Sequence, residues 1–253
     1  MTRNGKRVAW VTGGGSGIGE AGAEALAADG WTVVVSGRRK DALDAVVATI
    51  AAAGGAAEAI ALDVSDAAQA QGAADQIVAR HGRIDLLVNN AGINVPRRSW
   101  KDMELEGWDK LVQVNLNGVL YCMRAVLPTM RKQQDGSIIN VSSWAGRHVS
   151  KMPGPAYTTT KHAVLALTHS FNMDECVNGL RACCLMPGEV ATPILNLRPV
   201  VPSAEEQARM LQPADLGRTI AFIAGMPPRV CINELLISPT HNRGFIQTPA
   251  NRD

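Results

Sequence analysis

The stretch TGGGSGIG, residues 12–19, separates the first apolar run of the chain from a segment with helical character. Glycines permit a tight turn and let the backbone approach a bound group closely. The start of the following helix offers free N–H groups and a favourable dipole to a phosphate. A glycine cluster alone is weak support, but its position between a first strand and a first helix is typical of a dinucleotide-binding turn. The spacing of Gly13, Gly17 and Gly19 is T-G-x-x-x-G-x-G.

Short apolar runs alternate with helical segments along the rest of the chain. Strands are predicted at residues 7–12, 31–36, 57–62, 85–89, 137–142, 181–186 and 232–238. Helices are predicted at residues 18–29, 41–53, 65–81, 106–131 and 155–178, with Ser65 as the cap of the third. This alternation, without hairpin signals, implies parallel strands joined by helical crossovers.

We therefore expect an α/β fold, with one domain over residues 1–253. It should contain a Rossmann-type, doubly wound parallel sheet of about seven strands, with helices on both faces. Residues 194–212, with prolines at 199 and 202 and the next at 213, are predicted to be an inserted loop that serves the substrate and not a second domain.

The composition excludes several classes of protein. The 25 basic and 23 acidic side chains give a formal charge of +2, which leaves no global footprint for nucleic acid or an anionic membrane. No apolar run approaches a membrane span, and no signal peptide opens the chain. The five cysteines form no C-x-x-C pair and are interpreted as reduced, which favours a cytoplasmic protein. The five histidines have no metal-ligand spacing, so we expect no metal.

One of only two tyrosines, Tyr157, lies four residues before Lys161 in a predicted helix, so both share a face. A surface pair is the simpler interpretation. The alternative is an acid–base site in which the ammonium of Lys161 lowers the pKa of the Tyr157 phenol towards neutrality.

Three separated motifs decide between them. The glycine turn, the sequence Asn89-Asn90-Ala91-Gly92 and the pair Tyr157-x-x-x-Lys161 together resemble the short-chain dehydrogenase/reductase family, over roughly residues 5–240. The resemblance implies an oxidoreductase that moves a hydride between a nicotinamide cofactor and a secondary alcohol or ketone, with Tyr157 as the acid or base. The segment after residue 231 is more similar to the branch of NADP-dependent 3-hydroxy acid dehydrogenases.

The resemblance also implies a catalytic set of Asn115, Ser143, Tyr157 and Lys161. Ser143 would hold the substrate oxygen, with Ser142 as the alternative. Asn115 would bind a water on the proton path to Lys161, and the nearby Asn117 is its competitor.

The end of the second predicted strand bears on the choice of cofactor. Gly37 stands where NAD-preferring relatives place a carboxylate, and Arg38 follows it, which favours the 2′-phosphate of NADP. The alternative is that Arg38 and Arg39 cap a helix or face solvent. Because Ser16 is not basic, NAD remains a second cofactor to consider. The remaining expected cofactor contacts are Gly13, Ser16, Gly17, Ile18, Gly19, Asp63, Val64, Asn90, Ala91, Gly92, Pro187, Gly188, Val190 and Thr192, together with Tyr157 and Lys161.

The substrate pocket is expected to form from residues 144–154, the segment after Val95 and the loop 194–212. Arg147, Lys151 and Arg198 are its available cations, and Trp144 and Met152 its apolar wall. The family commonly forms dimers or tetramers, so a homo-oligomer is expected by analogy. Two other functions remain open: a nucleotide-sensing module without turnover, and an alcohol dehydrogenase that prefers NAD.

Overall fold

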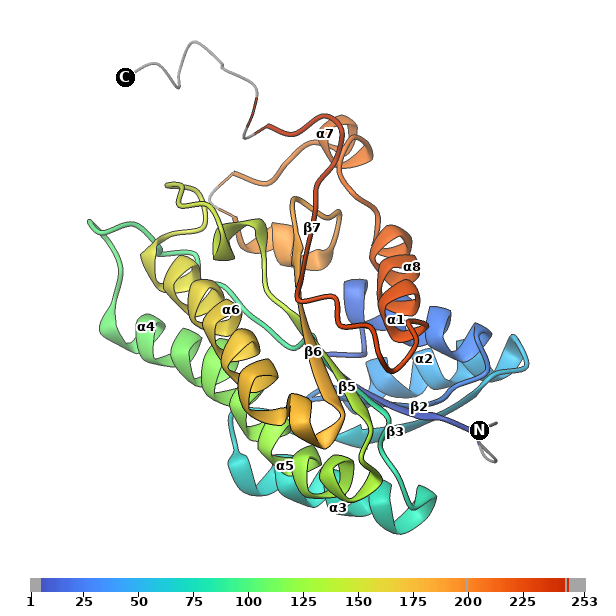
Figure 1. The fold of residues 1–253 in the computed structure, drawn as a ribbon. Coiled ribbons are helices and arrows are strands. Elements are labelled where there is room, and N and C mark those ends of the chain that lie inside the picture. Colours follow the sequence, from blue (N-terminus) through green and yellow to red (C-terminus); the bar gives the residue numbers. More distant parts are fainter. Residues whose placement is uncertain (1–5, 199, 244, 246–253) are drawn as a thin grey trace.

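The computed structural model describes residues 6–198, 200–243 and 245 of the expected domain, and the remaining positions lie outside the description. At its centre is a parallel sheet with the strand order β3-β2-β1-β4-β5-β6-β7 (Figure 1). The strands are β1 (Val8–Thr12), β2 (Thr32–Gly37), β3 (Ala56–Ala61), β4 (Leu86–Asn89), β5 (Gly136–Val141), β6 (Leu180–Pro187) and β7 (Glu234–Ile237). The predicted doubly wound α/β class is confirmed.

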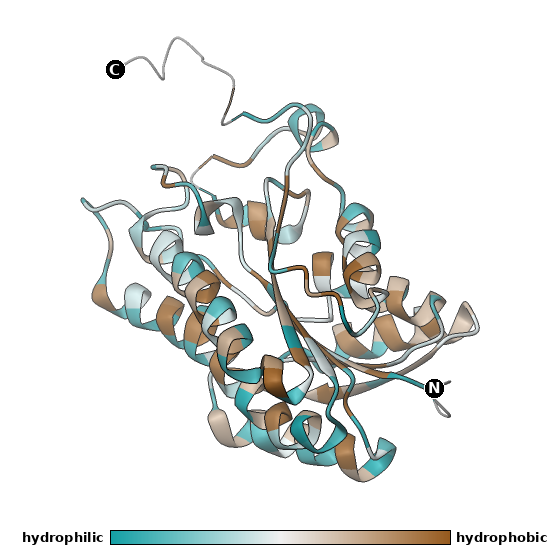
Figure 2. Ribbon diagram, viewed as in Figure 1, coloured by the Kyte–Doolittle hydropathy of each residue, from teal (hydrophilic) through white to brown (hydrophobic). Residues whose placement is uncertain are grey.

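Helices cover both faces of this sheet. The longer helices are α1 (Gly17–Ala28), α2 (Lys40–Ala52), α3 (Ala67–His81), α4 (Leu105–Val112), α5 (Gly118–Gln133), α6 (Pro155–Glu175) and α8 (Pro213–Ala224). One buried cluster joins the sheet to α1, α2 and α8, and a second joins it to α3, α5 and α6. Figure 1 shows these two groups on opposite sides of the strands. In Figure 2 the helices carry alternating brown and teal bands, as expected for helices that bury one face.

The central strands β1, β2, β4, β5 and β6 are mostly apolar because each contributes side chains to both clusters. In β1, Ala9 and Val11 belong to the first cluster, whereas Val8 and Trp10 belong to the second. Successive side chains of a strand point to opposite faces, so a strand covered on both sides has no solvent face to fill with polar residues. The single polar atom of Trp10 is satisfied by donating to Ser36 Oγ at 2.9 Å.

The glycine turn connects β1 to α1. Gly13 and Gly17 have φ values of 63° and 59°, in the left-handed region that favours glycine. Gly19 serves packing instead, because a Cβ there would lie 2.3 Å from the carbonyl oxygen of Gly13. Asn90, after β4, donates from Nδ2 to the carbonyls of Thr12 and Gly13, so the turn is braced by the neighbouring loop.

Three helical predictions need correction. The N-cap of α3 is Asp66, not Ser65: the Asp66 carboxylate accepts from the N–H groups of Ala68 and Gln69. The predicted helix at 106–131 is interrupted by a π-helical turn at Gln113–Asn117 between α4 and α5. Helix α8 was not predicted at all, because its first residue, a proline, was interpreted as part of a loop.

The proline of α8 is a helix-start signal. Pro213 occupies the first turn, where its missing N–H costs nothing, and Gln212 and Asp215 form a reciprocal capping box. The helix packs closely on α1, since a Cβ at Gly217 would lie 2.5 Å from the carbonyl oxygen of Ala21. The loop predicted at 194–212 itself contains the short helices Pro193–Leu197 and α7 (Ala204–Ala208).

The substitution Gly19→Ala tests the packing of the turn. We expect it to lower the free energy of unfolding by about 1–3 kcal/mol, because the added methyl group meets backbone that cannot move aside. Urea unfolding followed by circular dichroism would measure the change. Gly72→Ala in α3 is the matched control: nothing lies within 4 Å of the new methyl group, and we expect it to stabilise by roughly 0.5–1 kcal/mol. Equal effects of both substitutions would contradict the packing role of Gly19.

Candidate active site

A cavity of about 660 Å³ opens at the carboxyl ends of the strands, where ligands bind in doubly wound sheets. Every residue predicted for the site lines this cavity except Gly19 and Asn115. The structure therefore gathers residues that are up to 179 positions apart, from Gly13 to Thr192, around one space. The expected pocket residues Trp144, Met152 and Arg198 line it as well, whereas Arg147 and Lys151 do not.

Lys161 is deeply buried, with only 4% of its surface exposed. Its Nζ donates to the carbonyl of Val141, at the end of β5, at 2.9 Å. The same nitrogen lies 5.5 Å from the ring centroid of Tyr157, one helical turn away on α6. Burial disfavours the charged form and lowers the pKa of Lys161 to about 8, from its ordinary 10.5.

The pKa of Tyr157 is raised, not lowered as predicted. Burial is the largest cause, and it is opposed by a hydrogen bond with Ser143 and by the positive charges of Arg198 and Arg98. Lys161 does not contribute to the shift. The reason is that its own lowered pKa leaves it neutral over the pH range in which the phenol ionises. Tyr157 is thus a protonated phenol at neutral pH.

The two adjacent serines have different surroundings. Ser142 is buried, and its hydroxyl donates to the backbone carbonyl of Lys161 at 2.8 Å. Ser143 is only partly buried, lines the cavity and hydrogen-bonds with Tyr157. Both serines line the cavity, but the Ser142 hydroxyl is already bonded to the Lys161 carbonyl, so Ser143 is the better placed of the two to meet a bound group.

Asn115 lies behind the cavity wall, in the π-helical turn. Its side chain is fully buried and makes two hydrogen bonds to the backbone of Ile93, one as acceptor at 2.8 Å and one as donor at 2.9 Å. Asn117 instead bonds to Gln113. A Cβ added to Gly92 would lie 3.5 Å from both Asn115 Oδ1 and Lys161 Nζ, so these two side chains approach the same point.

An exposed cation, Arg38, lines the cavity just after the end of β2. It has no hydrogen-bond acceptor among the described residues. Neither Arg39, the residue before α2, nor Arg38 caps that helix with its side chain. Asp63 accepts from Ser65, at 2.7 Å from its hydroxyl. Burial raises the pKa of Asp63, but the bonds from Ser65 and the charge of Arg38 outweigh it and the net shift is downward.

The fit of a dinucleotide can be tested on the glycine turn. Ser16 precedes α1, and its side chain does not cap the helix, so the first N–H groups have no side-chain partner. A Cβ at Gly17 would lie 3.1 Å from Thr192, which closes the turn from the opposite side. Free N–H groups beside glycine backbone are what a pyrophosphate requires, so the residues present fit such a group.

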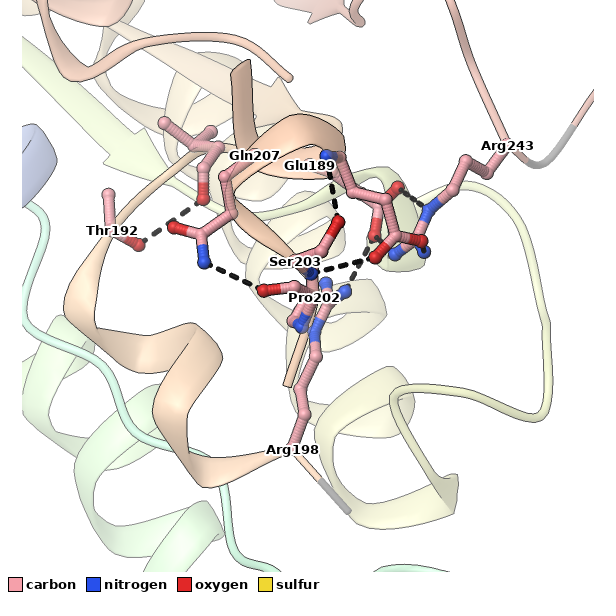
Figure 3. A network of polar contacts seen from close by, with 9 residues as sticks. Glu189, Thr192, Arg198, Pro202, Ser203, Gln207 and Arg243 are labelled. Atoms are coloured by element: carbon pink, nitrogen blue, oxygen red, sulfur yellow. Dashed lines mark hydrogen bonds and ion pairs between the residues drawn. The ribbon is translucent and has the colours of Figure 1, made fainter. Parts of the chain in front are cut away.

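An ion-pair network holds the loop that follows β6. Glu189 accepts from Arg198 at 2.7 Å and from Arg243 at 2.8 Å, and Arg243 also reaches Glu206 on α7 (Figure 3). These bonds outweigh burial and lower the pKa of Glu189, so the carboxylate is charged. The network connects the predicted substrate loop to the last described residues of the chain.

Several cavity residues carry no sequence motif, and two of them, Asn94 and Arg98, bear on the chemistry of the site. Arg98 lies in the segment after Val95 that was expected to line the pocket, and Asn94 lies just before that segment; both line the cavity. No motif marks either position, because the chain between β4 and α4 has no regular structure.

Within the described residues no cluster of metal-ligating side chains occurs, and no helix is long and apolar enough to cross a membrane. All five cysteines are free thiols; Cys176 and Cys231 are exposed.

Comparison with known proteins agrees with the fold. Residues 7–199 match the model of the short chain dehydrogenase family. An uncharacterized oxidoreductase of Staphylococcus saprophyticus is 32% identical over 241 residues, which cover 92% of this chain and 96% of the relative. The chain belongs to the short-chain dehydrogenase family.

Two solved structures have a fold similar to that of this chain over nearly its whole length. An alcohol dehydrogenase from the archaeon Thermococcus sibiricus, complexed with 5-hydroxy-NADP, has a TM-score of 0.85 and 27% identity, covering 94% of this chain and 98% of the other. The closed form of a serine dehydrogenase complexed with NADP+ has a TM-score of 0.85 and 28% identity, covering 95% and 98%.

The depressed pKa of Lys161 predicts how stability depends on pH. The folded protein releases this proton near pH 8 and the unfolded chain near 10.5, so in that window the unfolded chain binds more protons and Lys161 makes stability rise with pH. In Lys161→Met this contribution is lost. The free energy of unfolding of the wild type, relative to the variant, should therefore increase by on the order of 3 kcal/mol between these pH values. Denaturant unfolding at a series of pH values measures it; a constant difference would mean that Lys161 titrates normally.

Proposed function

We propose that this chain is an NADP(H)-dependent oxidoreductase that interconverts a carbonyl compound and a secondary alcohol, with Tyr157 as the acid or base. The observation that carries the proposal is the contact of Tyr157 with Ser143 and Lys161 in the same cavity as the glycine turn. The family membership supports the reaction class, and the two solved relatives bound to NADP or its derivative support the cofactor.

The cofactor would occupy the strand ends from the glycine turn to Thr192. Its pyrophosphate would lie against the first N–H groups of α1, and its adenosine end between Arg38 and Asp63. Its nicotinamide end would approach Tyr157, near the segment from Pro187 to Thr192. When bound, the reduced nicotinamide supplies the hydride.

Tyr157 is suited to donate the proton during reduction. Its raised pKa keeps the phenol protonated at neutral pH, and the Ser143 hydroxyl beside it would hold the substrate oxygen. After transfer, the phenolate is stabilised by Ser143 and by the charges of Arg198 and Arg98. Lys161, whose pKa of about 8 is close to neutrality, would return a proton, with Asn115 helping to hold a water behind it.

The set of four side chains argues against a sensing module without turnover. A module that only binds nucleotide has no need of the Ser143–Tyr157 pair, which is suited to a reacting oxygen. We also propose that residues 194–212 serve the substrate, and that the protein is a cytoplasmic homo-oligomer. Met173 in the last turn of α6 and Val177 in the short 3-10 turn that follows it are exposed apolar side chains, and they are suited to contact another subunit.

Tyr157→Phe tests the acid role. We expect the rate of carbonyl reduction to fall by about 10²–10⁴-fold, since the variant has no proton to donate. The dissociation constant for NADPH should change less than about 3-fold, because the ring remains. Steady-state kinetics over a panel of ketones and fluorescence titration with NADPH measure the two quantities.

The chain supplies its own control in the second tyrosine. Tyr121→Phe in α5 removes a hydroxyl that faces Gln113 and does not line the cavity, so turnover should be unchanged. Turnover by Tyr157→Phe at a rate near that of the wild type would overturn the proposed function.

Arg38→Ala tests the cofactor preference. A guanidinium bonded to the 2′-phosphate contributes about 1.5–3 kcal/mol, so NADPH affinity should fall by about 10- to 100-fold while NADH affinity is nearly unchanged. Isothermal titration with each nucleotide measures this. Lys40→Ala removes the same charge two residues later, from a side chain that is paired with Asp44, and should affect neither nucleotide. An equal loss for NADPH and NADH in Arg38→Ala would mean that Arg38 does not read the phosphate.

A further inference from the structure

Arg98 is held in place by backbone on two sides. It packs against Gly154, the residue before α6, where a Cβ would lie 2.2 Å from the Arg98 carbonyl oxygen. Its Nη2 donates to the carbonyl of Leu197 in the loop after β6. Asn94 fastens the same segment by donating to the carbonyl of Pro153 at 3.1 Å. The backbone of Arg98 is therefore held at the start of the catalytic helix, and its guanidinium is held at the substrate loop.

This guanidinium lacks the acceptors that a buried cation needs. Only 9% of Arg98 is exposed, and its Nε is fully buried without a hydrogen-bond partner. The single protein acceptor, among the described residues, is the carbonyl of Leu197. A buried donor without a partner costs free energy, and a buried charge costs more, unless a ligand completes it.

The neighbouring cations differ from Arg98 in this respect. Arg198 and Arg243 both bind Glu189, and Arg243 also binds Glu206. The carboxylates of Glu189 and Glu206 therefore compensate Arg198 and Arg243. Arg98 has no carboxylate partner among the described residues. Its pKa is lowered by burial first and by the charge of Arg198 second, and no carboxylate acts on it.

The free side of Arg98 faces the reaction site. Arg98 lines the cavity together with Ser143 and Tyr157, and its charge acts on the Tyr157 phenol. Trp144 and Met152 provide apolar surface in the same cavity. A small molecule whose oxygen contacts Tyr157 would present its other end to this region.

We propose that Arg98 binds a carboxylate of the substrate, so that the enzyme acts on oxo acids and the corresponding hydroxy acids. The inference rests on the proposed function of the same site. A planar guanidinium pairs with a carboxylate through two parallel hydrogen bonds. Arg98 itself carries one charge without a carboxylate partner, which matches a carboxylate better than a phosphate monoester. The carboxylate is unchanged by the reaction and serves to orient the carbonyl towards Tyr157.

The first test compares charged and neutral substrates. Wild type should reduce at least one member of a panel of 2-, 3- and 4-oxo acids with a kcat/KM about 30-fold or more above that of its methyl ester. Arg98→Gln should abolish this preference by lowering kcat/KM for the acid about 30-fold more than for the ester, whose smaller loss reflects the missing charge beside the Tyr157 phenolate. Arg98→Lys keeps the positive charge but lacks the two parallel N–H donors of the guanidinium. It should therefore recover part of the loss.

Arg97→Gln is the matched control. It makes the same change one residue earlier, where the side chain is 69% exposed and paired with Glu104, and should leave the preference intact. A wild type that reduces esters as well as acids would overturn the carboxylate inference and leave the proposed function standing. An equal loss for acid and ester in Arg98→Gln would also overturn it, because Arg98 would then serve the structure or the phenol alone.

The second test needs no turnover. Butyrate should bind to the protein saturated with NADP+, and butyramide should bind about 30-fold more weakly, as measured by isothermal titration. Arg98→Gln should lose the difference, and Arg97→Gln should keep it. If butyrate binds in this way but no ketone or oxo acid is reduced, the proposed function fails while the carboxylate site stands. If inorganic phosphate binds through Arg98 more tightly than butyrate, the assignment to a carboxylate is overturned.

Discussion

The hydroxyl of Thr12 joins the two loops on which the whole site depends. It accepts from the N–H groups of Asn90 and Ala91 and donates to the carbonyl of Val88, so the end of β1 is tied to the end of β4. These neighbouring strands mark the point where the strand order reverses, and the chain leaves them towards opposite ends of the sheet. A crevice forms at such a point, and the Thr12 hydroxyl ties its two sides together.

The chemistry of the crevice comes from charge held away from water. Lys161 is buried and donates to the Val141 carbonyl, and its burial lowers its pKa to about 8. Arg98 is also buried, and its Nε has no hydrogen-bond partner. Neither placement stabilises the fold by itself, because burial of a cation is unfavourable unless its partners are supplied. Such positions are typical of functional sites, where the groups that complete them arrive with the ligands.

The fold was largely predictable because its signals are local. Continuous apolar strands, helical periodicity and the glycine turn each depend on neighbours in sequence, and together they predicted all seven strands. Helix α8 was missed because Pro213 was taken as a loop residue, although Gln212 and Asp215 supply a capping signal. The π-helical turn that contains Asn115 has no such signal, since a single added residue in a helix leaves the local pattern nearly unchanged.

The sequence by itself determined the α/β class, the order of the strands along the chain and the Tyr157–Lys161 pair. These features follow from local patterns and from the spacing of motifs in the sequence. Only the tertiary structure decided which side chains act on Tyr157. Lys161, four residues after Tyr157, is not among the groups that shift the phenol pKa, whereas Arg98 and Arg198, which lie 59 residues before and 41 residues after Tyr157, contribute the charges that do. A pKa depends on burial and on distances in space, and neither is written in sequence separation.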